Sequence, residues 1–126
     1  MIGIDLVKIE RIEKLLAKHP QKALKRFLHE EEIALAANSS QTIAGFYAAK
    51  EAISKALGSG ISAECGFMDI KLHKDEKGAP YFTLSRSIVA KYEIEDTALS
   101  ITHDGGFAIA VATLLSKKKK KHNIFH

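Results

Sequence analysis

Hydrophobic residues follow two different periods along the chain, and the period changes near residue 60. Between residues 7 and 57 they recur every three or four positions, as on one face of a helix. From residue 67 to 115 they mainly alternate with polar residues, as in strands, and a short apolar stretch at residues 1–7 also has the character of a strand. One strand, then helices, then mainly antiparallel strands predict an α+β fold, in which a long central helix packs on the sheet.

The helical half is expected to contain four helices, at residues 7–18, 22–28, 29–38 and 41–57. His19-Pro20 ends the first of them, because a proline disfavours the helical conformation in the residue before it. The strand half is expected to contain four strands, at residues 67–73, 81–85, 98–103 and 107–115, and a short helix at residues 87–95. A turn at residues 74–80 separates the first two strands, and Asp104-Gly105-Gly106 has the composition of a tight hairpin between the last two.

The helix at residues 41–57 combines two apolar stripes. One contains large side chains, at Ile43, Phe46, Ile53 and Leu57, and the other contains only alanines, at Ala44, Ala48, Ala52 and Ala56. A stripe of alanines lets another backbone approach the helix closely. Gly58 directly follows the last turn and is a natural C-cap.

The positive charge of the chain is concentrated at its end. The formal net charge is +4, and five of the 19 basic residues are consecutive lysines at 117–121. The remaining 14 are balanced by 15 acidic residues, so residues 1–115 are close to neutral. A chain of 126 residues has the length of one domain. We therefore expect a single domain at residues 1–115 and a basic, disordered tail at residues 116–126.

Cysteine usage and the opening residues indicate a cytoplasmic protein. Cys65 is the only cysteine, which excludes an internal disulfide framework and a zinc site made of several thiolates. The opening stretch reaches Asp5 too soon for a secretory signal, and no apolar run has the length of a membrane span.

Acidic and basic residues occur inside the tightly packed helix, where Tyr47, Glu51 and Lys55 are spaced four apart and share one face. Glu51 and Lys55 could simply form an i,i+4 pair that stabilises the helix, and Asp5 could cap the helix that follows it. However, Asp5 and Glu51 together offer two hard carboxylates from different elements, a donor set that suits Mg²⁺. Lys55 and backbone amides near Gly58 and Gly60 could then hold phosphate oxygens.

A second candidate group is the sequence Ser-Ile-Thr-His-Asp at residues 100–104. His103 ends a strand and Asp104 begins a turn, and both are common in purely structural roles. Together they could also supply a base or a phosphate ligand near neutral pH.

Four segments give the chain a family resemblance: Gly3-Ile4-Asp5, FYAAKEAISKALGSGI at residues 46–61, KGAPYF at 77–82 and LSITHDGGFAIAVA at 99–112. In order and spacing they resemble holo-acyl-carrier-protein synthase, the short bacterial-type 4'-phosphopantetheinyl transferase. The resemblance covers roughly residues 1–115. It implies the 4'-phosphopantetheinyl transferase fold, with active sites at subunit interfaces of a homotrimer.

The resemblance also implies a reaction. The 4'-phosphopantetheine group of coenzyme A would be transferred to a serine of apo acyl carrier protein, which releases adenosine 3',5'-bisphosphate and activates the carrier for fatty acid biosynthesis. Asp5 and Glu51 would hold Mg²⁺ against the diphosphate, and Lys55 would contact a phosphate. The remaining residues implied for coenzyme A are Gly58, Gly78, Pro80, Thr102, His103 and Asp104.

The general base stays open between Glu51, a metal-bound water or hydroxide, and the pair His103/Asp104. A surface that binds the acidic carrier is expected at Arg11, Lys18, Lys22, Lys25 and Arg26, although a solvated helix face would also carry such residues. The chain departs from the family where Phe46-Tyr47 replaces the usual Arg-Phe, where Lys77 replaces a frequent Asn, and in its lysine tail.

Other functions fit the sequence less well. The lysine run could bind nucleic acid or another anionic surface, but there is no Trp, and the nine Phe and Tyr do not cluster in a strand pair as a stacking platform would. We therefore expect that nucleic acid is not the main partner. An inactive structural member of the same fold would not need Asp5, Glu51 and Lys55 together. The larger pseudo-dimeric transferases are about twice this length.

Overall fold

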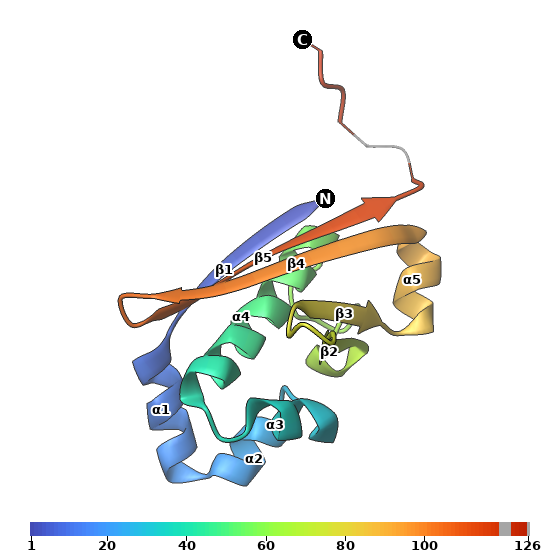
Figure 1. Cartoon of the computed structure of the whole chain (residues 1–126). Coiled ribbons are helices and arrows are strands. Elements are labelled where there is room, and N and C mark those ends of the chain that lie inside the picture. Colours follow the sequence, from blue (N-terminus) through green and yellow to red (C-terminus); the bar gives the residue numbers. More distant parts are fainter. Residues whose placement is uncertain (119–121, 126) are drawn as a thin grey trace.

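The computed structural model describes residues 1–118 and 122–125, and its elements follow the order that the hydrophobic pattern predicts (Figure 1). They are β1 (Ile2–Lys8), α1 (Ile9–Lys18), α2 (Pro20–Lys25), α3 (Glu30–Ala36), α4 (Ser40–Leu57), η1 (Phe67–Asp69), β2 (Ile70–Lys74), β3 (Pro80–Leu84), α5 (Arg86–Tyr92), β4 (Ile94–Asp104) and β5 (Phe107–Ser116). The predicted α+β class is confirmed. No helix in the described part of the chain is long and apolar enough to cross a bilayer.

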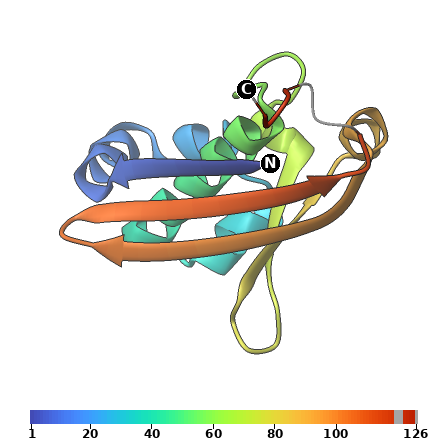
Figure 2. The ribbon, with the colours of Figure 1, turned by 90° about the horizontal axis from the view of Figure 1, so that it is seen from above.

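Three long strands form an antiparallel sheet in the order β1-β5-β4. Seen from above, β5 runs between the other two, so the first strand of the chain pairs with the last (Figure 2). The register places Asp5 opposite Ala110 and His103 opposite Ala108. Asp5 and His103 therefore lie on opposite edge strands of the same sheet.

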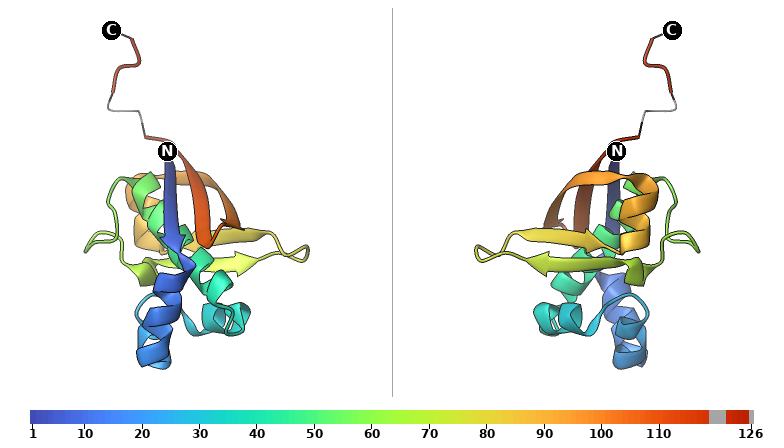
Figure 3. Two further views of the ribbon diagram at one scale, coloured as in Figure 1. Left: turned by 90° about the vertical axis from the view of Figure 1, so that its left-hand side faces the viewer. Right: turned by 90° about the vertical axis from the view of Figure 1, so that its right-hand side faces the viewer.

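Helix α4 lies against one face of this sheet (Figures 1 and 3). The alanine stripe makes the contact close. All four stripe alanines are buried, and so are the facing alanines of β5. A Cβ atom at Gly3 of β1 would lie 1.9 Å from the carbonyl oxygen of Ala52 and 2.7 Å from the nitrogen of Ala56. The backbones of β1 and α4 are thus in direct contact, and only glycine fits at residue 3.

The strands β2 and β3 form a separate two-stranded hairpin, whose turn projects away from the body of the molecule (Figure 2). Lys74 pairs with Pro80 at the end of the ladder next to the turn. Asp75 orders the turn, because its Oδ1 accepts from the backbone N–H groups of Lys77 and Ala79, both at 2.9 Å. Gly78 adopts a positive φ of 83°, which completes the turn.

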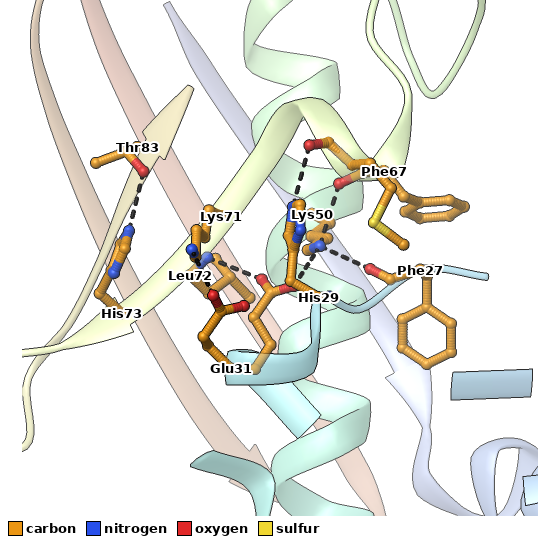
Figure 4. Close-up of polar contacts among 11 residues, drawn as sticks. Phe27, His29, Glu31, Lys50, Phe67, Lys71, Leu72, His73 and Thr83 are labelled. Carbon is orange, nitrogen blue, oxygen red and sulfur yellow. Dashed lines mark hydrogen bonds and ion pairs between the residues drawn. The ribbon is translucent and has the colours of Figure 1, made fainter. Parts of the chain in front are cut away.

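Lys50 and Glu32 form an ion pair in the interior, where both side chains are 0% exposed (Figure 4). The Lys50 ammonium donates to Glu32 Oε1 at 2.8 Å and to the carbonyl oxygens of Phe27 and Phe67 at 2.6 and 3.1 Å. Glu32 also accepts from the backbone N–H groups of His29 and Leu72. Burial lowers the pKa of Lys50, and the hydrogen bond with Glu32 acts in the opposite direction. One polar network therefore joins α3, α4 and the start of β2.

Several element boundaries differ from the prediction. The first helix begins at Ile9 rather than residue 7, because β1 pairs with β5 as far as Lys8. The predicted strand 67–73 starts with a 3-10 turn, η1, and becomes a strand only at Ile70. Glu93 has a positive φ of 50° and ends α5 at Tyr92, so β4 begins four residues before the predicted strand. Gly58 caps α4 with a φ of 84°, as predicted.

The Lys50–Glu32 pair predicts a large loss of stability when only one partner is removed. Lys50→Met leaves the Glu32 carboxylate buried without its counter-charge, and we expect the free energy of unfolding to fall by about 3–5 kcal/mol in a denaturant titration. Lys50→Met combined with Glu32→Gln should recover part of this loss, because the amide keeps an acceptor oxygen and carries no charge. Lys14→Met is the control, since its partner Glu10 is exposed, and should cost less than about 1 kcal/mol. Equal losses for the two lysines would contradict the assignment.

Candidate functional site

Asp5 and Lys55 meet where β1 crosses α4. Asp5 is in the middle of β1 and shares its inward face with Gly3 and Val7, because successive side chains alternate between faces. Its Oδ1 accepts a hydrogen bond from the Lys55 ammonium at 2.8 Å, and the side chains are 15% and 51% exposed respectively. This hydrogen bond raises the pKa of Lys55. The alternative that Asp5 caps the next helix is wrong, because the N-cap of α1 is Lys8.

Glu51 and Tyr47 continue this group along α4, at one and two turns before Lys55. The Lys55 ammonium bonds to Asp5 rather than to Glu51, so the geometry is not that of a simple i,i+4 pair within the helix. Burial raises the pKa of Tyr47, and the neighbouring Glu51 carboxylate raises it further. Two half-buried carboxylates and one ammonium from separate elements therefore share a small surface, which we call the carboxylate cluster (Asp5, Glu51, Lys55).

The carboxylate cluster has the donor chemistry of a magnesium site. Within residues 1–118 and 122–125, no group of three or more His, Cys, Asp or Glu side chains is placed to hold a metal ion. Magnesium needs no such group, because it is typically held by one or two protein carboxylates together with waters and substrate phosphates. In this structure Asp5 already has one cationic partner, the Lys55 ammonium at 2.8 Å.

The amides of Gly58 and Gly60, proposed as phosphate ligands from the sequence, are both engaged within the chain. Gly58 N–H donates to the carbonyl oxygen of Lys55 at 3.0 Å, and Gly60 N–H donates to that of Ser54 at 3.1 Å. Neither amide is free to bind phosphate in this geometry. Lys55 is thus the group at this end of α4 that remains accessible to an anion.

His103 lies on the other side of α4, near the start of the helix. Its Nε2 donates to the carbonyl oxygen of Gln41 at 2.8 Å, and the other ring nitrogen, Nδ1, takes no part in this hydrogen bond. The close approach is possible because a Cβ atom at Gly45 would come within 3.0 Å of Ile101 and 3.4 Å of the His103 ring. His103 borders a cavity of about 140 Å³, which we call the histidine cavity; it is lined by Thr42, Gly45, Phe46, Lys74, Gly78, Pro80, Ile101 and His103.

The structure brings three of the predicted nucleotide-contacting residues together in the histidine cavity, namely Gly78, Pro80 and His103. Thr102 and Asp104 do not line this cavity, because neighbours of His103 in a strand point to the opposite face. His103 and Asp104 therefore do not form a side-chain pair. Phe46, which replaces the usual arginine, is buried and forms part of the cavity wall.

The basic residues expected to bind a carrier are exposed on α1, on α2 and at the end of α2. Arg11 lies over the ring of Tyr47, with its Cζ 5.7 Å from the ring centroid, next to a groove that Lys14, Leu15 and Lys18 also line. The others are Lys22, Lys25 and Arg26. Arg11 thereby links the basic surface to Tyr47, which lies one turn before Glu51 on α4.

Sequence reasoning missed the role of Lys50, although a signal was present. Lys50 is four residues after Phe46 and three before Ile53, so it lies on the stripe of large apolar residues. A charged residue on such a stripe is buried and needs a partner. The identity of the partner, Glu32, could not be read from the sequence because it depends on how α3 folds back on α4.

Comparison with known proteins identifies the family of this chain. Residues 1–112 match the family model described as the 4'-phosphopantetheinyl transferase superfamily. The chain is similar to the holo-[acyl-carrier-protein] synthase of Wolinella succinogenes, with 61% identity over 94% of this chain and 99% of that protein. The corresponding protein of Nautilia profundicola is 57% identical over 91% of this chain and 99% of its own length.

Solved structures show the same fold. The holo-[acyl-carrier-protein] synthase of Helicobacter pylori in complex with coenzyme A superimposes with a TM-score of 0.89 and 50% identity, covering 91% of this chain and all of that one. A synthase from Bacillus anthracis, in complex with CoA (3',5'-ADP), gives a TM-score of 0.77 at 38% identity over 92% of this chain and 96% of that one. The resemblance and the fold predicted from the sequence are confirmed: this chain belongs to the 4'-phosphopantetheinyl transferase superfamily.

Proposed function

We propose that this chain transfers the 4'-phosphopantetheine group of coenzyme A to a serine of apo acyl carrier protein, in the cytoplasm and for fatty acid biosynthesis. The observation that carries the proposal is the carboxylate cluster in a chain of this family, where Asp5 and Glu51 lie beside Lys55. In the reaction, the serine oxygen bonds to the phosphorus that carries pantetheine. The bond from that phosphorus to the bridging oxygen breaks, and adenosine 3',5'-bisphosphate leaves.

The carboxylate cluster is suited to this chemistry because the serine attacks a phosphorus that already carries negative charge, and the leaving group is an anion. Asp5 and Glu51 would hold Mg²⁺, which neutralises negative charge on the diphosphate when bound. Lys55 stays protonated at neutral pH, since its hydrogen bond to Asp5 raises its pKa. It would then contact a phosphate oxygen and stabilise the charge that develops on the departing group.

Deprotonation of the serine remains open between Glu51 and a metal-bound water or hydroxide. His103 is a weaker candidate within one chain, because it lies across α4 from the carboxylate cluster and bonds to the carbonyl oxygen of Gln41. Gly78, Pro80 and Thr102 are kept as proposed coenzyme A contacts, and so is Gly58 through atoms other than its N–H, which bonds to the Lys55 carbonyl oxygen. Asp104 is kept as a proposed catalytic residue. The single domain at residues 1–115 and the tail at 116–126 also stay predictions, and residues 119–121 and 126 of that tail lie outside the described residues.

We further propose that the protein acts as a homotrimer with shared sites. The face of the β1-β5-β4 sheet opposite α4 is not covered by any described element (Figures 1 and 3). It exposes large apolar side chains that alternate with the inward-facing ones: Ile2, Ile4, Leu6 and Leu115, which are 55–70% exposed. Such a contiguous apolar surface favours association. The carboxylate cluster and the histidine cavity lie toward opposite edges of the sheet, which suits a site completed by a neighbouring subunit.

The reaction is tested by intact-mass spectrometry of apo acyl carrier protein incubated with this protein, coenzyme A and Mg²⁺. We expect the carrier to gain one phosphopantetheine, and a chelator to abolish the gain. Glu51→Gln should slow transfer roughly a hundredfold or more, because it removes a carboxylate from the proposed metal site. Glu64→Gln is the matched control, since Glu64 bonds to Tyr92 and Lys91 of α5 and not to the cluster. No gain with folded wild-type protein and several carriers would refute the proposal.

The carrier surface is tested by charge reversal at Arg11. Arg11→Glu should raise the KM for the acidic carrier about tenfold or more and change the KM for coenzyme A much less, because Arg11 belongs to the basic surface of α1. Lys91→Glu on α5 provides a control of equal charge change away from this surface. Steady-state kinetics with each substrate varied in turn separate the two constants. An unchanged carrier KM in Arg11→Glu would remove this role.

The uncovered sheet face is tested by placing a charge in its centre. Ile4→Lys should give a monomer in size-exclusion chromatography with light scattering. The introduced lysine would be buried in the subunit interface, facing the same lysine of the neighbouring subunits, without an acidic partner. Transfer activity should fall with the trimer, while the circular dichroism spectrum stays unchanged. Leu35→Lys, at an exposed leucine of α3, should leave both assembly and activity intact. A wild-type monomer with full activity would rule out the shared-site proposal.

A further inference from the structure

The ring of Tyr47 is held from several sides. It packs edge-on against Phe27, with the ring centroids 5.2 Å apart and an interplanar angle of 83°, and it contacts Phe67 at a centroid distance of 5.7 Å. The carbonyl oxygens of Phe27 and Phe67 both accept hydrogen bonds from the buried Lys50 ammonium (Figure 4). Arg11 covers the Tyr47 ring, with its Cζ 5.7 Å from the centroid. The packing of the ring therefore fixes the position of the Tyr47 hydroxyl.

The hydroxyl of Tyr47 faces Glu51. The two residues are four apart on α4, so they lie on the same face of the helix, one turn from each other. Burial raises the pKa of Tyr47, the charge of Glu51 and a side-chain hydrogen bond with Glu51 raise this pKa further, and the charge of Arg11 acts in the opposite direction. Tyr47 is thus protonated at neutral pH and donates to the Glu51 carboxylate.

The two carboxylates of the carboxylate cluster have different donors. Asp5 accepts a hydrogen bond from the Lys55 ammonium at 2.8 Å. Glu51 takes part in none of the ion pairs formed by the described residues, so Lys55 does not restrain it. A half-buried glutamate without a donor would sample several rotamers. The hydroxyl of Tyr47 suits Glu51 because it restrains the carboxylate and leaves its negative charge available to a cation.

The hydroxyl is an addition of this chain to the family pattern. Phe46-Tyr47 stands where the usual residues are Arg-Phe. The aromatic ring at position 47 is therefore kept, and its contacts with Phe27 and Phe67 account for it. These contacts do not account for the hydroxyl, whose nearest functional neighbour is Glu51.

We infer that Tyr47 is a positioning residue for Glu51, whose hydroxyl donates to one carboxylate oxygen and leaves the other oxygen available to a cation. The inference deepens the proposed function and rests on it for the identity of the cation and of the reaction. Tyr47 acts through Glu51 and does not itself contact the reacting phosphate. Asp5 and Glu51 are then each oriented by one donor, Lys55 and Tyr47, before a substrate binds.

Tyr47→Phe tests the hydroxyl alone, because the ring and its packing are kept. We expect kcat for carrier modification to fall about tenfold and the Mg²⁺ concentration for half-maximal rate to rise by a similar factor. Loss of a group that orients a metal-binding side chain typically has an effect of roughly this size. The KM for the carrier should stay nearly unchanged, because the ring beneath Arg11 remains.

Tyr92→Phe is the matched control. Tyr92 on α5 also donates a hydrogen bond to a glutamate, Glu64, at 3.0 Å. The substitution therefore removes the same kind of contact from a pair that does not belong to the carboxylate cluster, and it should leave kcat and the Mg²⁺ requirement as in wild type. A wild-type kcat in Tyr47→Phe, or a loss confined to the KM for the carrier, would overturn the inference.

A double-mutant cycle separates this inference from the proposed function, because denaturant titrations need no metal, nucleotide or carrier. It compares wild type, Tyr47→Phe, Glu51→Ala and the double variant; alanine is chosen because glutamine would still accept the hydrogen bond. We expect the two substitutions to be non-additive, with a coupling of about fivefold in the unfolding equilibrium constant. Additive effects in a protein that modifies the carrier would refute the role of Tyr47 alone. Coupled effects in a protein that modifies no carrier would refute the transfer alone.

Discussion

The direct contact between the backbones of β1 and α4 is the constraint on which the carboxylate cluster depends. Gly3 leaves no room for a side chain above Ala52, and the alanine stripe brings the whole helix to the same short distance from the sheet. At this separation a short aspartate on β1 reaches a lysine on α4, so Asp5 bonds to Lys55. A larger residue at position 3 would push the two elements apart and separate the carboxylates, although neither carboxylate would be altered.

The buried Lys50–Glu32 pair fixes the other side of the same helix. Lys50 is adjacent in sequence to Glu51 but points to a different side of α4, toward α3 and β2. Because every polar atom of the pair is satisfied, the network tolerates only one arrangement of these elements. Helix α4 is therefore held from both sides, by close packing toward the sheet and by directional bonds away from it. This double restraint orients Glu51 on a rigid element.

The sequence predicted elements and motifs well where local rules decide the outcome. The α+β class, the long helix with its alanine stripe and the Gly58 cap follow from periodicity and local conformation, and all are confirmed. The functions of individual charges were harder to predict, because partners distant in sequence decide them. Lys55 bonds to Asp5 across 50 residues instead of to Glu51 one turn away.

The two polar sites of the chain are separated by the helix that builds them both. Glu51 and Lys55 use the second half of α4 with β1, whereas the histidine cavity uses its first half with β4 and the hairpin. Since β1 and β4 are the outer strands of one sheet, a substrate bound between them within one chain would have to pass around the helix. Coenzyme A has its diphosphate and its adenine nucleotide at adjacent positions, so it cannot make such a detour. In the homotrimer that we propose, the carboxylate cluster of one subunit would face the histidine cavity of another, and the uncovered apolar sheet face would be the surface for that association.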